Sequence, residues 1–419
     1  MRARGIVVWA LAAASLGGST AFARSPVHDL RAESFTVIAV VDSGINPYHD
    51  DFARPGLTAH PSTYVRGFPK SAPALRLSLD EDYATAVSDD ERVWDSLPAS
   101  TLTWIPGTNI VGAIGPFDSG DVQPVLDRHG HGTSTASLAA GMIHGPRSRN
   151  VLLVVVKGFE GGLRWAAKQP WIDVVTNSWG PPFWLTGSEE IVGAGSGMAA
   201  ASRAAVERGK MTCFATGNLA APTLPNPTAG PSWVMSVGAA SATTRGEHAY
   251  TAWPNDILGL SGMDAADNRS TGGVSEGFNG TSAASPSACG SVAAALARAR
   301  AAVHDTVEGP HGGGLLVSSR RRGYLQDGVL TRVELEDAVM LTARPAETSP
   351  PSPQDPFAIP GPPAGGFVRG GYGIVDGDSA RDAYELVLGR VERPDRTVED
   401  AWFAALEEIR NALWGDPPG

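Results

Sequence analysis

Residues 37–52 read VIAVVDSGINPYHDDF, and this stretch decides the fold. The apolar run over residues 35–41 is typical of a strand that is buried on both faces of a parallel sheet. It stops at Asp42, where an Asp-Ser-Gly sequence indicates a tight turn. Because open α/β sheets place their ligands at the carboxyl ends of the strands, Asp42 is a candidate functional carboxylate. A plain turn is the alternative interpretation.

Further apolar runs alternate with helical patterns along the chain. This alternation predicts an α/β fold of three layers, in which a mostly parallel, twisted sheet carries helices on both faces. Thr331 and Glu334 have the spacing of a capping box, which marks the start of one helix. The predicted strands cover residues 35–41, 151–156, 172–177, 211–216 and 233–238, and the predicted helices cover residues 132–142, 161–168, 188–208, 282–303, 332–343 and 379–390.

Three segments break this pattern. Residues 53–126 show few periodic signals, so we interpret them as an insertion whose acidic patch is a solvated face. Residues 346–366 are rich in proline and glycine, which predicts a surface loop. We expect a closing helix over residues 397–414, packed on the domain through four apolar residues at helical spacing: Trp402, Leu406, Ile409 and Leu413.

The first 23 residues have the layout of a secretory signal peptide, with Arg2 and Arg4, an apolar run over residues 6–16, and small residues up to Ala23. That run is shorter than the ~20 residues that a membrane span needs. We therefore expect cleavage near Ala23, secretion, and no membrane span in the mature chain. About a dozen residues separate Ala23 from the first predicted strand, so we expect no folded pro-segment between them.

The formal net charge of the chain is −11, which disfavours binding to nucleic acid and to anionic lipid. We expect neither as a partner. The two cysteines, Cys213 and Cys289, exclude a disulfide-dense scaffold. One bridge between them is compatible with export, but two buried thiols in a packed core is the favoured interpretation.

A histidine motif follows the 53–126 stretch. The sequence DRHGHGTSTASLAAG places His131 just ahead of small residues, which predict a helix that approaches the sheet closely. His129 and His131 also have a spacing that suggests a metal pair, but no cysteine or acidic partner lies at ligand spacing. We therefore assign no metal and treat His131 as a candidate base.

A serine and an asparagine complete the set. The sequence FNGTSAASPSACGSVAAALARAR places Ser282 at the start of an alanine-rich helix, with Pro286 in its first turn. Free backbone N–H groups and the helix dipole stabilise negative charge there, although simple helix capping is the alternative. The predicted strand in MTCFATGNLA leads into Gly217-Asn218, and the amide of Asn218 is able to donate to a developing oxyanion. An ordinary Gly-Asn turn is the alternative for that residue.

Together these motifs resemble a known family. VVDSGI, HGT, TGN and NGTSAASP match the four signatures of the subtilisin-like peptidases, or subtilases, in the order Asp, His, Asn, Ser. This order differs from that of the chymotrypsin-like peptidases and of the α/β-hydrolases. GLRWAAKQPWIDVVTNSWG, WVMSVGAAS, LEDAVMLTA and GGYGIVDGDSARDA are similar to further family segments, so the resemblance covers most of residues 35–390, except 53–126 and 310–330.

The resemblance implies a secreted serine endopeptidase with a catalytic domain over residues 24–395 and a C-terminal helix within 396–419. Ser282 would be the nucleophile, His131 the general base and Asp42 the residue that orients it. Asn218 and the backbone N–H of Ser282 would stabilise the oxyanion. The resemblance also implies the uncharged walls of a specificity pocket that prefers apolar side chains, formed by Ser178, Trp179, Gly180, Ala215, Thr216 and Gly217.

Several expectations remain open at this point. For Trp179, packing is an equally good interpretation. No cofactor is expected to be required; calcium stabilises many family members, but no spacing here matches a calcium loop, so no site is assigned. We expect a monomer that acts on protein or peptide substrates. The alternatives are peptide ligation or macrocyclisation through the same acyl-enzyme, and an inactive binding protein that keeps the fold.

Overall fold

The structure is a computed structural model, and all of its described residues belong to the compact unit that spans residues 31–419. The predicted signal peptide, residues 188–196 of one predicted helix and residues 348–366 of the predicted loop lie outside the described residues. The structure describes residues 34–118, 124–180, 197–218, 228–248, 250–252, 255–303, 314–318, 321–347 and 371–418.

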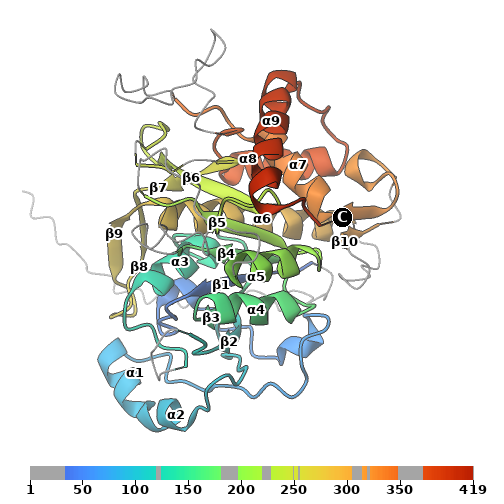
Figure 1. Ribbon diagram of the computed structural model, residues 1–419. Helices are drawn as coiled ribbons and strands as arrows, with labels where there is room; N and C mark the ends of the chain where they lie inside the picture. The colour runs from blue at the N-terminus through green and yellow to red at the C-terminus, as the bar shows by residue number, and fades with distance from the viewer. Residues whose placement is uncertain are drawn as a thin grey trace, which may run out of the picture. The chain divides into compact units, whose positions relative to one another are not determined.

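The described residues form a seven-stranded sheet in the order β2-β3-β1-β4-β5-β6-β7, and every neighbouring pair is parallel (Figure 1). All five predicted strands are present. The strands are β1 (Thr36–Asp42), β2 (Ile110–Ile114), β3 (Val151–Lys157), β4 (Val174–Asn177), β5 (Met211–Ala215), β6 (Met235–Ser241) and β7 (Ile257–Ser261). Two antiparallel hairpins pair β8 (Met263–Ala266) with β9 (Val274–Phe278) and β10 (Gly314–Val317) with β11 (Val329–Thr331).

Helices cover both faces of the sheet, which confirms the predicted three-layer α/β fold (Figure 1). On one face α3 and α6 pack against each other, and α8 packs on α6; on the other face α4 and α5 form a pair. The predicted capping box of Thr331 and Glu334 is present at the start of α7. The helices are α1 (Tyr83–Asp89), α2 (Glu91–Ser96), α3 (His131–Ala140), α4 (Glu160–Lys168), α5 (Gly197–Val206), α6 (Thr281–Val303), α7 (Arg332–Thr342), α8 (Gly377–Val387) and α9 (Thr397–Trp414).

The alanine-rich α6 lies unusually close to its neighbours because small residues face it. A Cβ atom added at Gly259 of β7 would clash with the carbonyl group of Ala284, and one added at Gly290 of α6 would clash with the carbonyl group of Ala139 in α3. Glycine is therefore required at both contacts. This close packing fixes the start of α6 relative to the carboxyl ends of the strands.

The 53–126 stretch is more than an insertion, because it contributes β2, the edge strand of the sheet. It also forms α1 and α2, which are joined to the core by hydrogen bonds. The hydroxyl group of Tyr48 donates to Asp90 at 2.9 Å and accepts from the indole of Trp94 at 2.9 Å. The few periodic signals of this stretch did not predict these elements.

The C-terminal helix α9 has the predicted bounds but a different buried face. Ile409 and Leu413 are 54% and 40% exposed, so their predicted packing was wrong, whereas Leu406 is buried as predicted. Nothing is described for the side chain of Trp402, the fourth predicted contact. Arg410 and Trp414 are buried instead.

Polar pairing explains this rotation of α9. The guanidinium group of Arg410 pairs with Asp256 at 2.6 Å and donates to the carbonyl oxygen of Gly230 at 2.7 Å. A second buried pair, between Arg300 of α6 and Asp173, has N–O distances of 2.7 and 2.8 Å. Asp256 precedes β7 and Asp173 precedes β4, so both ion pairs lie at the amino ends of the strands.

Cys213 and Cys289 form a disulfide, with 6.7 Å between their Cα atoms. The favoured interpretation of two free thiols was therefore wrong. Both residues are fully buried, as predicted, and the bond joins β5 to α6. A separation of 76 residues in sequence hides this proximity, since only the stacking of α6 on the sheet creates it.

Across the part of the chain that the structure describes, no helix combines the length and the apolar character needed to cross a membrane.

Candidate active site

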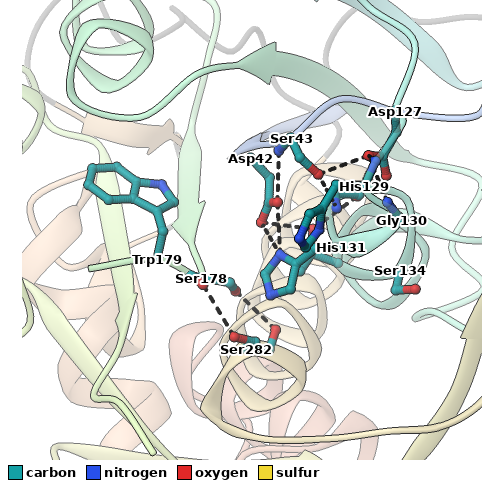
Figure 2. Close-up of polar contacts among 12 residues, drawn as sticks. Asp42, Ser43, Asp127, His129, Gly130, His131, Ser134, Ser178, Trp179 and Ser282 are labelled. Carbon is teal, nitrogen blue, oxygen red and sulfur yellow. Dashed lines mark hydrogen bonds and ion pairs between the residues drawn. The ribbon is translucent and has the colours of Figure 1, made fainter. Parts of the chain in front are cut away.

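Asp42 and His131 meet at the carboxyl end of β1. Asp42 is the last residue of that strand, and His131 is the first residue of α3. The Nδ1 atom of His131 lies 2.8 Å from Oδ1 and 3.0 Å from Oδ2 of Asp42 (Figure 2). The carboxylate also accepts from the backbone N–H of Ser43 at 2.8 Å and from the hydroxyl group of Thr135 at 3.3 Å. The carboxylate is thereby fixed from three directions.

This geometry determines which nitrogen of His131 carries the proton. An ionised carboxylate only accepts hydrogen bonds, so Nδ1 is the donor and Nε2 is left as an acceptor in the neutral ring. Burial lowers the pKa of His131, but the charge and hydrogen bond of Asp42 and the charge of Asp127 outweigh it, so the net pKa is raised. The ring of Phe278 also contacts the imidazole edge-to-face, with 5.6 Å between ring centroids. The imidazole is therefore held in place by both polar and aromatic contacts.

Asp127 is a site residue that sequence analysis missed. It is buried, and its two carboxylate oxygens accept five hydrogen bonds of 2.8 to 3.0 Å from the residues around the start of α3. The donors are the hydroxyl group of Ser43, the N–H groups of His129 and Gly130, and both the N–H and hydroxyl groups of Thr133. The signal for it was an acidic residue four positions before His131 in DRHGH.

Ser282 is the second residue of α6, at the same rim of the sheet. Its hydroxyl group donates to the carbonyl oxygen of Ser178 at 3.2 Å, and the hydroxyl group of Ser178 donates back to the carbonyl oxygen of Ser282 at 2.9 Å. Figure 2 shows the imidazole of His131 lying between Asp42 and Ser282. The structure thus brings the three predicted residues to one place, joins His131 to Asp42, and holds the hydroxyl group of Ser282 on the end of β4.

Asn218 lies beside the residue that precedes Ser282. Its Oδ1 atom accepts from the N–H of Thr281 at 2.8 Å and from the hydroxyl group of Thr281 at 3.0 Å. Two donors on one oxygen fix the orientation of the amide, so Nδ2 is the end of the amide that is able to donate. Gly280 packs against this amide in a left-handed conformation with φ of +82°, where a Cβ would lie 2.9 Å from Nδ2. The amide donor and the first turn of α6 are therefore neighbours.

Comparison with known families decides the assignment. The model of the subtilase family matches residues 34–309. The chain belongs to the subtilase family. Subtilases are serine-type peptidases, and the matched residues include all four predicted groups of the site. Among solved structures, the chain is similar to the prenylagaramide maturation protease PagA, at 16% sequence identity over 83% of this chain and 94% of that chain, with a TM-score of 0.44. No curated protein sequence matches the chain.

The predicted pocket walls of this subtilase lie after β4 and within and after β5, next to the site. Trp179 is only partly exposed, and its indole N–H donates to the carbonyl oxygen of Val41 at 2.9 Å. Its ring also contacts Phe159 and Phe214 edge-to-face. Trp179 therefore packs across the end of β1, which supports the alternative interpretation of that residue. Of the other predicted wall residues, Ser178, Ala215 and Thr216 are buried, Gly217 is partly buried and Gly180 is exposed.

Proposed function

We propose that this subtilase is a secreted serine endopeptidase that uses Asp42, His131 and Ser282 as its catalytic triad. The observation that carries the proposal is the two-oxygen contact of Asp42 with Nδ1 of His131, which leaves Nε2 as a base facing Ser282. Asn218 supplies the oxyanion donor together with the backbone N–H of Ser282. These four groups are what acyl transfer by a serine nucleophile requires.

The reaction begins when the hydroxyl group of Ser282 leaves the carbonyl oxygen of Ser178 and turns to Nε2 of His131. Ser282 then attacks the scissile carbonyl carbon while His131 takes its proton and later gives it to the leaving amine. Asp42 stabilises the imidazolium ion in between. Asn218 stabilises the negative oxygen of the tetrahedral intermediate. Water repeats the sequence on the acyl-enzyme and releases the second product.

The substrate is a protein or peptide, with an apolar side chain in the primary pocket. The uncharged character of residues 178–180 and 215–217 supports this preference. No cofactor enters this mechanism, and the absence of a required cofactor, the monomeric state and secretion stay predictions. Cleavage-site profiling of a peptide library tests the side-chain preference, and a preference for charged side chains would contradict it.

A fluorophosphonate probe tests the nucleophile, because it reacts covalently with an activated serine. We expect labelling of the wild type at Ser282, loss of labelling and of peptide hydrolysis in Ser282→Ala, and no loss in Ser287→Ala, a control in the same helix. The labelled peptide is identified by mass spectrometry. Labelling at another serine, or hydrolysis by Ser282→Ala, would refute the proposal.

A further inference from the structure

The chain around Tyr250, between β6 and β7, is fixed to the sheet. The N–H of His248 donates to the carbonyl oxygen of Ala239 in β6 at 2.9 Å. The hydroxyl group of Thr251 donates to the same carbonyl and accepts from the N–H of Ala239, both at 3.2 Å. Tyr250 is partly buried and packs against the hydrophobic core. The backbone on both sides of Tyr250 is therefore held to β6.

The same segment contacts two loops, the loop that contains Asn218 and the loop that precedes Ser282. The N–H of Ala252 donates to the carbonyl oxygen of Gly217 at 3.1 Å, and Gly217 directly precedes the oxyanion asparagine. The hydroxyl group of Tyr250 accepts from the N–H of Gly280 at 3.2 Å, and Gly280 lies two residues before the nucleophile. One short segment thus connects the two loops.

Gly280 is held at both of its backbone groups. Its N–H donates to Tyr250, and its carbonyl oxygen accepts from the hydroxyl group of Ser261 at 3.1 Å. The hydroxyl groups of Tyr250 and Ser261 are themselves 3.2 Å apart, within hydrogen-bond distance. Because Thr281 follows Gly280 and holds the amide of Asn218 with its N–H and hydroxyl groups, a displacement of Gly280 moves the oxyanion donor as well.

The ring of Tyr250 is held independently of its hydroxyl group. His248 stacks on it face-to-face, with 4.8 Å between ring centroids and 12° between the ring planes. Phenylalanine preserves this stacking and nearly the volume of the side chain, so Tyr250→Phe removes only the hydroxyl group with its contacts to Gly280 and Ser261. The hydroxyl group is accordingly open to a specific test.

We propose that Tyr250 is a positioning residue for the oxyanion site of this enzyme. Its hydroxyl group fixes Gly280, and through Thr281 it sets the direction in which Nδ2 of Asn218 donates. This inference rests on the proposed function, because it assigns Tyr250 to the same acyl transfer. Such a residue acts on the transition state rather than on ground-state binding, so it affects kcat more than KM.

The test is a double-mutant cycle between Tyr250→Phe and Asn218→Ala, measured by hydrolysis of a chromogenic peptide. We expect Tyr250→Phe alone to lower kcat about tenfold, the effect of one lost hydrogen bond, with KM within about twofold of the wild type. In the Asn218→Ala background, Tyr250→Phe should change kcat by less than about twofold, because the group that it positions is gone. Tyr384→Phe is the matched control, because it removes a hydroxyl group of α8 that accepts from Arg390, and it should leave kcat unchanged.

An unchanged kcat in Tyr250→Phe would overturn the inference. So would a double variant whose fold loss in kcat equals the product of the losses in the two single variants. If Tyr250→Phe does not fold, Ser261→Ala replaces it, since it loosens Gly280 from the carbonyl side, and the same criterion applies. Failure of the proposed function is recognised separately, because Ser282→Ala would then keep the wild-type rate. With an inactive Ser282→Ala, the cycle reports on Tyr250 alone.

Discussion

At the scale of single residues, His131 experiences two opposed influences on its charge. Burial favours the neutral imidazole, whereas the carboxylates of Asp42 and Asp127 favour the cation and prevail. A general base must be neutral, so activity should fall as the pH decreases through the raised pKa of His131, above its ordinary value of 6.5. The acid limb of kcat/KM measures this pKa in the free enzyme.

Asp42→Asn should move the pKa of His131 downward. The substitution removes the charge that stabilises the imidazolium ion, while burial, which lowers the pKa, remains. We expect a lower pKa in an NMR titration of the imidazole in Ser282→Ala/Asp42→Asn than in Ser282→Ala. Asp264→Asn, which neutralises an exposed carboxylate of β8, should leave the titration unchanged. An unchanged or higher pKa after Asp42→Asn would contradict this account.

Sequence motifs identified the residues proposed to touch substrate but not those that hold them. Asp42, His131, Asn218 and Ser282 each sit in a short motif, so local sequence was sufficient to find them. Asp127 accepts hydrogen bonds from N–H groups of the residues that follow it, and Tyr250 accepts one from the N–H of Gly280 in another segment. Hydrogen bonds to backbone groups require no particular residue at the partner position, so no pattern links Tyr250 to Gly280, and for Asp127 the only signal is its place four residues before His131.

At the scale of elements, the disulfide joins β5, the strand that leads to Asn218, to α6, the helix that has Ser282 in its first turn. The bond spans 76 residues and restricts the conformations of the unfolded chain. Without it the unfolded chain has more conformational entropy, so the unfolded state becomes more favourable. We expect Cys213→Ala/Cys289→Ala to lower the free energy of unfolding by about 4 kcal/mol. Denaturant unfolding measures the difference.

Reduction supplies the control for this disulfide. Wild type that is reduced while unfolded and refolded under reducing conditions should have nearly the same free energy of unfolding as Cys213→Ala/Cys289→Ala. Reductant should not change the free energy of unfolding of the double variant. Two reactive thiols in denatured, unreduced wild type would contradict the bond.

The two strands of the seven-stranded sheet that sequence analysis missed, β2 and β7, each have a glycine at the centre. A Cβ atom added at Gly112 of β2 would lie within 3.4 Å of the side chains of Val154 and Trp171. One added at Gly259 of β7 would clash with the backbone of Ala284. Glycine breaks the apolar run that predicts a strand, yet the close approach of neighbouring elements requires it. The same packing that completes the sheet therefore hides its edge strands from a pattern search.

At the scale of the whole described unit, α9 is attached through a buried charge. Arg410→Met leaves Asp256 buried without its partner, which should cost about 3 to 5 kcal/mol of unfolding free energy. Arg410→Met/Asp256→Asn should recover at least about 1 kcal/mol of this loss, because the unpaired charge is removed. Thermal or denaturant unfolding provides the measurement.

Arg381→Met serves as the comparison, since Arg381 is exposed and its substitution should change stability by less than about 0.5 kcal/mol. Equal effects of the Arg410 and Arg381 substitutions would show that the buried pair does not hold α9.

The two buried ion pairs lie at the amino ends of the strands, whereas the groups proposed for catalysis lie at the carboxyl ends. The length of each strand separates these two sets of residues. Substitutions that change substrate preference at the carboxyl ends of the strands should therefore leave the two buried ion pairs at the amino ends intact. This separation makes the rim at the carboxyl ends of the strands the safer region for substitutions in directed evolution, because the ion pairs that stabilise the fold lie elsewhere.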